Sequence, residues 1–464
     1  MAMARDFDVA VIGAGPGGYV AAIRAAQLGL KVAVIERAEL GGICLNWGCI
    51  PTKALLRSAE VLHLMHEAQS FGLSAEGIGF DLDAIVKRSR GVSRQLSSGV
   101  AHLLRKNGVE VIRGRARLSG PTTVEVEAET PRSIEAGAVI LATGARARVL
   151  PGLEPDGQRI WSYRHALVPP FLPRRLAVLG SGAIGIEFAS FYRALGVEVT
   201  VIELAPRILP VEDAEIAALA TRSFEKQGMR ILAGASIETA TRGEDGLSLT
   251  IRQGETRIEM AADALISAVG IVGNVEDLGL EDLGVTIERS HVVTDARCRT
   301  GVPGLYAIGD VAGAPWLAHK ASHEGVMVAE HLAGLTVHPI RADRIAGCTY
   351  CRPQIASVGL TEEKARAAGH EIRVGRFPFI GNGKAIALGE AEGLIKTIFD
   401  AKTGELLGAH MVGAEVTELI QGFVVAMGLE TTEAELMETV FPHPTLSEMM
   451  HESTLAAWER ALHI

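Results

Sequence analysis

The sequence is poor in cysteine. Its 464 residues include five cysteines, at positions 44, 49, 298, 348 and 351. An odd and sparse set in a chain of this length does not fit the disulfide framework of a secreted domain. In a reducing compartment, two closely spaced cysteines are more often catalytic or metal-binding than structural. The pairs at 44 and 49 and at 348 and 351 are therefore candidates for chemistry.

The sequence also lacks an excess of positive charge and a long apolar run. A net charge of −10 argues against a nucleic-acid partner, because phosphates require a basic surface. No apolar stretch reaches the roughly 18–20 residues that cross a bilayer. The start of the chain, Met1–Asp6, has neither the pattern of a secretion signal nor that of a transit peptide. We expect a cytoplasmic protein of about three domains, with no membrane or nucleic-acid partner.

An internal repeat is the first positive signal. A strand-like run at Phe7–Ile12 is followed by glycines 13, 15 and 18, a helical stretch, and a second strand-like run that ends at Glu36. The same order recurs from Arg175–Leu179, with glycines 180, 182 and 185 and a run that ends at Glu203. Each copy predicts one βαβ unit. The continuous apolar runs predict parallel strands covered by helices on both faces.

Glycines at this spacing, between a strand and a helix, are typical of dinucleotide binding. The first permits a tight turn, the second lets the backbone approach a pyrophosphate, and the third allows the helix to pack closely on the strand. The helix N-terminus offers N–H donors to the diphosphate, and the final carboxylate accepts hydrogen bonds from the adenosine ribose. A single match would be a weak signal. Two complete copies, ending in Glu36 and Glu203, predict two dinucleotide sites, and both carboxylates favour NAD over NADP because they repel a 2′-phosphate.

The rest of the chain completes the expected architecture. Apolar runs end in glycine turns at 138–144 and 264–270, where each closes a nucleotide unit, and again at 304–309 before Asp310. After residue 343 the apolar pattern alternates, which predicts an antiparallel sheet with one solvated face. Helical segments follow from 415 to 437. We expect an α/β protein with two Rossmann-like dinucleotide-binding domains and a C-terminal α+β domain.

Cys44 and Cys49 lie in a segment with strong local signals. The four residues between them include a glycine and an asparagine, which ease the tight loop that a short-range disulfide requires. Pro51 predicts the first turn of a helix, so Cys49 is expected at a helix N-terminus, where the dipole favours a thiolate. Lys53 falls on the same side one turn later and can stabilise a negative sulfur or a reduced flavin. The alternative is a structural cysteine pair beside a surface lysine.

The other three cysteines carry weaker signals. Cys348 and Cys351 form a CxxC pair, but a structural zinc site needs four ligands and no second pair stands at a suitable spacing. A thioredoxin-like pair requires a βαβ context, whereas alternating strands follow this one. Cys298 is predicted to be an inert packing residue. We therefore expect no metal site.

Together these motifs resemble the pyridine nucleotide–disulfide oxidoreductases. The resemblance covers essentially the whole chain and follows the family's order of landmarks. These are the Gly13 fingerprint, the redox segment Gly41–Lys53, the turn Ala142–Gly144, the Gly180 fingerprint, Gly309–Asp310 with Leu317–Lys320, Pro353–Thr361 and His443–Glu448. The chain departs from the family after Gly270, where an arginine and a proline–asparagine pair are common and Ile271–Asn274 stands here.

The resemblance implies a division of labour among the catalytic residues. Cys44 would be the interchange sulfur that meets the substrate, and Cys49 the sulfur against the flavin. Lys53 would lie near the flavin ring. His443 and Glu448 would be the acid–base pair, and the histidine would enter the active site of the partner subunit in a homodimer.

The resemblance also implies the cofactor contacts and the domain bounds. The residues expected at FAD are Gly13, Gly15, Gly18, Glu36, Lys53, Thr143, Gly144, Asp310 and Ala318. Those expected at NAD are Gly180, Gly182, Gly185, Glu187, Glu203 and Gly270, with Glu187 also paired with Lys53. The implied domains are FAD-binding at 1–146, NAD-binding at 147–270, a second FAD or central part at 271–342 and a dimerisation domain at 343–464.

The implied reaction is the oxidation of protein-bound dihydrolipoamide to lipoamide with reduction of NAD⁺, through Cys44, Cys49 and FAD. The implied partners are the lipoyl domains of 2-oxoacid dehydrogenase or glycine-cleavage complexes. A glutathione-type reductase is the alternative, but it would pair NADPH with basic residues where this chain has Glu203. Mercuric reductases carry a C-terminal cysteine pair, and no cysteine follows Cys351 here. A non-catalytic flavin-binding scaffold is disfavoured by the complete catalytic set.

Overall fold

A computed structural model describes residues 5–464. The chain forms two compact units, which are described separately. Among the described residues, the first unit comprises 5–55, 80–148 and 270–340, and the second comprises 56–79, 149–269 and 341–464. The finer division into four domains stays a prediction. Within residues 5–464, no helix combines the length and the apolar character needed to cross a membrane.

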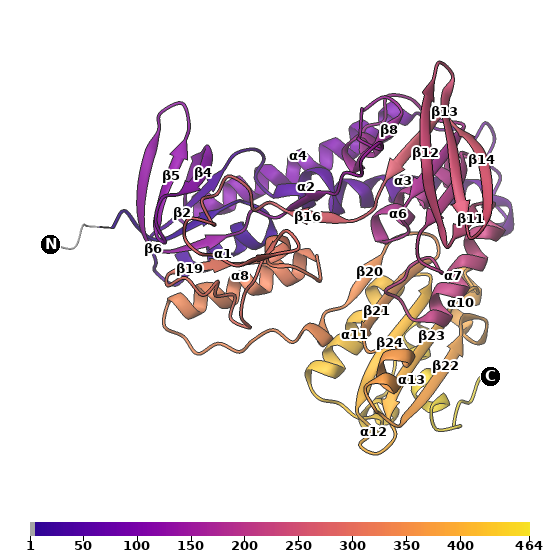
Figure 1. Ribbon diagram of the computed structural model, residues 1–464. Helices are drawn as coiled ribbons and strands as arrows, with labels where there is room; N and C mark the ends of the chain where they lie inside the picture. The colour runs from indigo at the N-terminus through magenta and orange to yellow at the C-terminus, as the bar shows by residue number, and fades with distance from the viewer. Residues whose placement is uncertain (1–4) are drawn as a thin grey trace. The chain divides into compact units, whose positions relative to one another are not determined.

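The first unit is built on a mixed sheet (Figure 1). Its parallel strands are β1 (Phe7–Ile12), β2 (Val32–Glu36), β3 (Glu110–Arg113), β6 (Arg132–Leu141) and β19 (Leu305–Ala307). The strands β4 (Arg115–Leu118) and β5 (Thr123–Glu127) extend it in antiparallel order from β6. The predicted strand, helix and strand of the first repeat are confirmed, with helix α1 at Pro16–Gln27.

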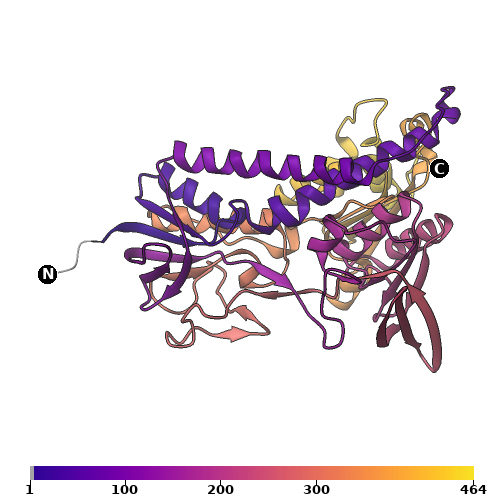
Figure 2. The same cartoon turned by 90° about the horizontal axis from the view of Figure 1, so that it is seen from above.

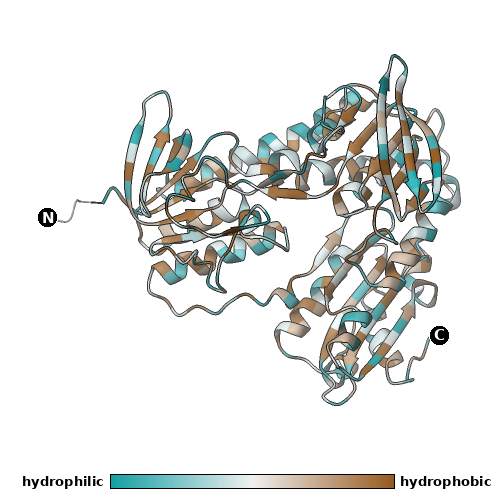
Figure 3. Cartoon of the chain, viewed as in Figure 1, coloured by the Kyte–Doolittle hydropathy of each residue, from teal (hydrophilic) through white to brown (hydrophobic). Residues whose placement is uncertain are grey.

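Helices cover only one face of this sheet, which corrects the sequence-based expectation. Val9 and Val11 of β1 face a core formed with α1, α4 (Leu82–Lys106) and α8 (Ala318–Leu332). Ala10 and Ile12 face a core formed with β4, β5 and residues 275–292. A continuous apolar strand requires an apolar cover on both faces, and an antiparallel sheet supplies one as well as a helix does. Figure 3 shows the hydrophobic residues gathered on the strands.

Short elements surround the carboxyl ends of these strands. They are α2 (Gly42–Trp47), α3 (Cys49–His66), β7 (Ala145–Ala147), β16 (Ile271–Gly273), β17 (Ile287–Glu288), β18 (His291–Val292) and the 3₁₀ turn η2 (Gly309–Ala312). The strands β7 and β16 pair in antiparallel register, as do β17 and β18. Figure 2 shows the long helix α4 beside α2 and the start of α3.

The second unit contains the second repeat. Its parallel sheet has the order β11 (Arg230–Ala233), β10 (Glu198–Glu203), β9 (Arg175–Leu179), β15 (Ala264–Ser267) and β8 (Ile160–Trp161). The helices that pack on it are α5 (Tyr163–Leu167), α6 (Ala183–Ala194) and α7 (Ala214–Lys226). A three-stranded antiparallel sheet of β12 (Ala235–Gly243), β13 (Gly246–Gln253) and β14 (Thr256–Ala262) covers the other face. Here too, helices cover one face only.

The C-terminal part of this unit is an antiparallel sheet, as predicted. Its order is β20 (Gly347–Thr349), β21 (Gln354–Gly359), β24 (Leu406–Gly413), β23 (Leu394–Asp400) and β22 (Ile372–Pro378). The associated helices are α9 (Glu362–Ala367), α10 (Gly383–Leu388), α11 (Val416–Gly428), α12 (Glu433–Glu438) and α13 (Glu448–Ala456), with the 3₁₀ turns η3 (Ala342–Arg344) and η4 (Phe379–Gly381). The helical region predicted from 415 to 437 is thus two helices.

The prediction of a solvated face on this sheet is wrong. The strands β23 and β24 are buried along almost their whole length, including Lys396, Thr397 and His410. Helices α11 and α13 pack on one face, and the N-terminal end of α7 packs on the other. The polar side chains that produced the alternating pattern are therefore inside the unit, where they have polar partners.

Lys396 is the clearest case. Its ammonium lies 2.9 Å from Asp213, 3.1 Å from Glu215 and 2.8 Å from Glu362, and the lysine is 2% exposed. Burial alone would lower the pKa of Lys396, but hydrogen bonds to Asp213 and Glu362 outweigh it and the pKa is raised. A buried charge persists only where it is paired in this way. The sheet and the start of α7 are therefore joined by a buried ion-pair cluster.

Candidate functional site

The two glycine turns have matching geometry. Gly13 and Gly180 adopt φ values of 102° and 97°, which favour glycine. A Cβ on Gly18 would lie 1.9 Å from the carbonyl oxygen of Gly13, and one on Gly185 would lie 2.0 Å from that of Gly180. Both turns therefore require glycine at the first position for conformation and at the third for packing.

The middle glycines, Gly15 and Gly182, face open space. Whether a pyrophosphate fits depends on that space. A Cβ on Gly182 would have no atom of the described chain within 4 Å, and one on Gly15 would meet only the Cα of Gly42 at 4.0 Å. Both residues precede a helix and have extended backbone, with α1 starting at Pro16 and α6 at Ala183. Each turn thus leaves room in front of a helix N-terminus for an anionic group.

The two predicted ribose carboxylates are held in the same way. Glu36 accepts hydrogen bonds from the backbone N–H groups of Ala14 and Ala38, both at 2.7 Å. Glu203 accepts from Ser181 N at 2.8 Å and from Ala205 N at 2.8 Å. Each carboxylate is therefore fixed beside its own glycine turn. The second copy has one further contact, a 2.6 Å hydrogen bond from Ser181 Oγ to Glu203.

The redox segment is a helix rather than the loop predicted between the cysteines. Cys44 lies within α2, which ends at Trp47, and Gly48 alone separates it from α3. The amide of Asn46 donates to the carbonyls of Leu40 and Gly42, so the asparagine closes the helix instead of opening a turn. The prediction that Cys49 begins a helix is confirmed. The two sulfurs therefore lie on consecutive helices joined by one glycine.

The redox segment is anchored on both sides. A Cβ on Gly42 would lie 2.7 Å from the Cα of Gly15, so this segment touches the first glycine turn backbone to backbone. On the other side α4 holds it through side-chain donors. Ser89 donates to Pro51 O at 2.9 Å, Ser97 to Leu40 O at 2.9 Å, and Arg90 to Asn46 O. Sequence analysis missed α4, whose serines and arginines have no motif spacing.

The electrostatic environment distinguishes the two cysteines. They are present as thiols, with Cys49 exposed and Cys44 half-buried. The hydrogen bond from the Cys44 thiol to Cys49, together with burial, raises the pKa of Cys44. Lys53 acts in the opposite direction and Asp310 in the same direction, so both lie close enough to influence this sulfur. The structure thus brings Asp310, which is distant in the sequence, close to the redox segment.

Asp310 is supported by a buried ion pair that sequence analysis missed. Burial raises the pKa of Asp310, and no described residue donates a hydrogen bond to its carboxylate. Lys320 donates to the carbonyls of Gly309 and Gly313 and lies 3.0 Å from Glu324, which accepts from Gly309 N at 2.7 Å. This pair holds the turn that presents Asp310. The spacing of four residues between Lys320 and Glu324 on a helix was the sequence pattern that could have predicted this ion pair.

The atypical segment after Gly270 supports the first nucleotide unit. Asn274 donates through Nδ2 to Thr143 O at 2.8 Å, and Thr143 Oγ1 donates to Asn274 O at 2.8 Å. The backbone N–H of Asn274 donates to Gly144 O at 2.9 Å. Asn274 therefore fixes the Ala142–Gly144 turn, and the departure from the family pattern leaves this contact in place.

His443 and Glu448 form the predicted pair. His443 Nδ1 lies 3.0 Å from Glu448 Oε1, and Glu448 Oε2 accepts from Thr445 N at 2.9 Å. Burial alone would raise the pKa of Glu448, but the hydrogen bonds from Thr445 and His443 outweigh it and the pKa is lowered. An ionised carboxylate only accepts hydrogen bonds, so His443 Nδ1 is the donor in this pair. The histidine side chain is 79% exposed.

Several predicted contacts stay predictions. Glu187 is buried on α6 and accepts from Tyr350 N at 3.0 Å, while its pairing with Lys53 is not tested. Gly270 has a φ of 103° and accepts from Arg148 N, and Ala318 begins α8. Both are consistent with backbone that a cofactor can approach.

The other three cysteines have different surroundings from the redox pair. Cys298 is buried in the core of the first unit, as expected of a packing residue, and burial raises its pKa to about 12. Cys351 is buried and its thiol contacts Pro353 O at 3.0 Å, and Cys348 lies 3.9 Å from Thr417 O. No role follows from these contacts.

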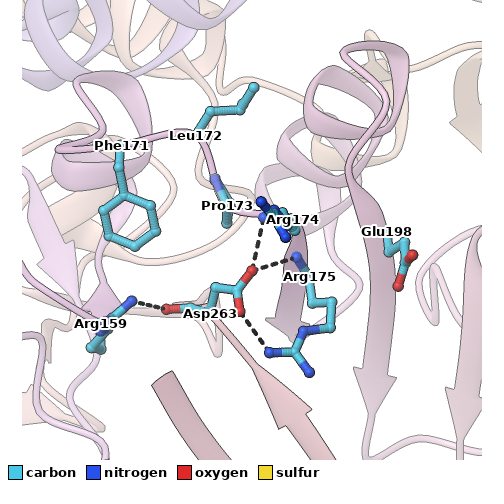
Figure 4. Close-up of a pocket in the computed structure, with 8 residues that line it drawn as sticks. All are labelled: Arg159, Phe171, Leu172, Pro173, Arg174, Arg175, Glu198 and Asp263. Atoms are coloured by element: carbon cyan, nitrogen blue, oxygen red, sulfur yellow. Dashed lines mark hydrogen bonds and ion pairs between the residues drawn. The ribbon is translucent and has the colours of Figure 1, made fainter. Parts of the chain in front are cut away.

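A cavity of about 530 Å³ in the second unit is not the nucleotide site (Figure 4). Its lining includes Arg175 and Glu198, the first residues of β9 and β10, and Asp263, which directly precedes β15. Ligands of such sheets bind at the carboxyl ends of the strands, whereas this cavity lies at the amino ends. Asp263 accepts hydrogen bonds from Arg174 and Arg175 there, and so joins the amino ends of the neighbouring strands β15 and β9.

The fold and the site define a class: oxidoreductases that couple a cysteine pair to two dinucleotides. Comparison with known proteins gives the family. Residues 7–325 match the pyridine nucleotide-disulphide oxidoreductase family, and residues 345–454 match its dimerisation domain. The chain belongs to this family.

Individual relatives extend over the whole chain. It is 58% identical to a dihydrolipoyl dehydrogenase of Zymomonas mobilis, with 99% of this chain and 100% of the relative covered. It is 56% identical to a dihydrolipoyl dehydrogenase of Rhizobium etli, with the same coverage. Among solved structures, LpdA from Mycobacterium tuberculosis is similar, with a TM-score of 0.90, 32% identity and coverage of 96% of this chain and 98% of that one.

Proposed function

We propose that this protein oxidises the dihydrolipoyl groups of a partner protein with NAD⁺, as a dihydrolipoyl dehydrogenase. The observation that carries the proposal is the hydrogen-bonded pair Cys44–Cys49, held backbone to backbone against the first glycine turn. A redox pair in that position can exchange electrons with a dinucleotide seated on the turn. The 58% identical relative named for this activity supports the same reaction.

The dithiol chemistry follows from the two sulfurs. With Cys44 and Cys49 oxidised to a disulfide, a substrate thiolate attacks the Cys44 sulfur, forms a mixed disulfide and releases Cys49 as a thiolate. The second substrate thiolate then attacks the substrate sulfur of the mixed disulfide, which releases Cys44 and closes the lipoyl disulfide. The hydrogen bond from Cys44 to Cys49, together with burial, raises the pKa of Cys44, which supports Cys49 as the sulfur that carries the negative charge of the reduced pair. Lys53 acts to lower the pKa of Cys44, so its ammonium lies close enough to stabilise a thiolate in this pair.

The proton transfers require a base. His443 Nε2 accepts the proton from a substrate thiol, and Glu448 at Nδ1 stabilises the imidazolium that forms. His443 is 79% exposed on the domain that matches the family's dimerisation domain. We propose that the protein is a homodimer in which the histidine of one subunit serves the cysteine pair of the other.

The cofactor sites follow from the two glycine turns. Gly13, Gly15 and Gly18 would hold the FAD diphosphate and Glu36 its adenosine ribose. Asp310 is half-buried and accepts no hydrogen bond from a described residue, so it would hold the hydroxyls of the ribityl chain. Gly180, Gly182, Gly185 and Glu203 would hold NAD in the same manner. Bound FAD supplies electron transfer between the sulfur pair and the nicotinamide. The lipoyl-bearing partner and a cytoplasmic location stay predictions, the latter carried by the sparse cysteines.

Gly182→Ala tests the nucleotide cradle directly. Since the new Cβ meets no atom of the described chain and Gly182 has extended backbone, the thermal midpoint is expected to stay unchanged. The methyl group occupies the space left for the pyrophosphate, so the Kd for NADH is expected to rise at least about tenfold, or roughly 1.4 kcal/mol. NADH fluorescence titration measures this. Gly185→Ala is the contrasting variant, which is expected to lose stability because its Cβ overlaps Gly180.

A steady-state assay tests the proposed function itself. The purified FAD-containing protein is assayed with NAD⁺ or NADP⁺ against dihydrolipoamide, and with NADH or NADPH against oxidised glutathione. We expect turnover with dihydrolipoamide and NAD⁺, because Glu203 repels the 2′-phosphate of NADP⁺. Activity with glutathione and NADPH alone would instead assign the protein to the glutathione-type reductases.

A further inference from the structure

The second nucleotide unit contains a hydrogen-bonded path that the first lacks. In the first nucleotide-binding repeat, the residue after the leading glycine is Ala14, and its backbone N–H donates to Glu36. In the second nucleotide-binding repeat, the same position is occupied by Ser181, which is fully buried. Its hydroxyl donates to Glu203 Oε2 at 2.6 Å and accepts from Leu209 N at 3.2 Å. The ribose carboxylate is thereby tied to the loop that follows it.

The loop between Glu203 and Asp213 is held by contacts among its own residues. Leu209 is buried and has a φ of 52°, an unfavourable conformation for a leucine that surrounding contacts must maintain. The guanidinium of Arg207 reaches the carbonyls of Pro210 and Glu212, at 3.5 and 3.4 Å. The loop ends at Asp213, whose side chain accepts from Glu215 N and caps α7.

Asp213 is the point where this loop joins the C-terminal sheet. Its Oδ1 receives the ammonium of Lys396 on β23 at 2.9 Å, and its Oδ2 accepts from Glu362 N at the start of α9 at 3.2 Å. Asp213 is 2% exposed, and so is Lys396. A buried ion pair of this kind has one well-defined geometry, since any displacement leaves charges without partners. The end of the loop is therefore fixed from the dimerisation domain.

We propose that Lys396 and Ser181 are positioning residues for NAD, which act by fixing the Glu203 carboxylate for the adenosine ribose. The path runs from Lys396 through Asp213 and the loop to Leu209, Ser181 and Glu203. The inference rests on the proposed role of Glu203 in the NAD site. Its consequence is that the C-terminal domain sets nucleotide affinity, in addition to any role in forming a dimer.

The test compares variants of the FAD-containing protein by direct NADH binding. Ser181→Ala reproduces the arrangement around Ala14 in the first unit. Its Kd for NADH is expected to rise about tenfold, the scale of one hydrogen bond to a charged group. Lys396→Met is expected to change the Kd in the same direction. Lys402→Met is the matched control, because Lys402 is 76% exposed in the same domain, and its Kd is expected to stay within twofold of the parent value.

Two further readouts separate positioning from a general loss of structure. The KM for NAD⁺ should rise in the variants. The FAD content should stay at the parent value. The rate of dihydrolipoamide oxidation with ferricyanide should also stay at the parent value, because this acceptor needs no nicotinamide site. Asp213→Asn keeps the cap of α7 and leaves Glu215 and Glu362 on Lys396, so it replaces Lys396→Met if that variant does not fold.

The outcomes are distinct. A Ser181→Ala protein with parent affinity for NADH overturns the inference, and so does a folded Lys396→Met protein with parent affinity. If the parent protein binds NADH but does not oxidise dihydrolipoamide, the proposed function fails, while the binding comparison still decides the role of the two positioning residues.

Discussion

Cys44→Ser is expected to bind FAD as the parent protein does and to show no detectable oxidation of dihydrolipoamide by NAD⁺. The hydroxyl cannot form the disulfide that the substrate thiolate attacks, nor the mixed disulfide that follows. FAD binding should persist because the contacts of the first glycine turn come from backbone and from Glu36, not from the sulfur. Turnover, FAD absorbance and titration of reactive thiols in denaturant measure the three properties.

Thiol counting distinguishes the proposed mechanism from a nonspecific loss of activity. After oxidation the parent is expected to lose two of its five reactive thiols, and Cys44→Ser to retain all of its remaining four. Cys348→Ser is the matched control, since Cys348 is half-buried on β20, in the C-terminal sheet, and contacts Thr417 O. It should keep full turnover. Substantial turnover in Cys44→Ser would remove this cysteine from the proposed mechanism.

His443→Gln is expected to lower kcat at least roughly a hundredfold, the usual lower scale for losing a positioned acid–base group. Glutamine can still donate a hydrogen bond to Glu448 but cannot accept a proton from the substrate thiol. The pKa of Glu448 is lowered, so this carboxylate is ionised at neutral pH. It can therefore stabilise the imidazolium that forms on His443 in the parent protein. The variant has no imidazole to protonate. Stopped-flow reduction by dihydrolipoamide isolates this step from the transfer to NAD⁺.

The same domain offers a close control for this substitution. His463 Nδ1 lies 2.7 Å from Glu452, and the histidine is 68% exposed, so it repeats the exposed histidine–glutamate arrangement. His463→Gln should keep turnover near the parent rate. Equal losses in both variants would indicate an electrostatic effect of the domain as a whole, and a near-parent rate in His443→Gln would exclude it as the base.

Much of the site could be predicted because its residues act through local spacing. The glycine turns, the ribose carboxylates, the helix start at Cys49 and the His443–Glu448 pair each depend on contacts within about one supersecondary unit. The errors arose where a pattern allowed two structures. The Cys44–Cys49 linker contains turn-forming residues, yet Asn46 uses its amide to complete α2 against Leu40. That choice depends on contacts with α4, which lie outside the segment.

The sequence by itself determined the chemistry of this protein: two nucleotide turns, a cysteine pair and a histidine–carboxylate pair, because these are fixed by residue type at short spacing. The tertiary structure alone decided what supports them. Sheets rather than helices cover the second face of each nucleotide unit, since an apolar strand does not specify the element that buries it. Lys396 meets Asp213 only because the fold brings β23 to the start of α7, which lies 183 residues earlier in the sequence. Buried polar side chains must find partners wherever the fold places them, and that placement is not written in local spacing.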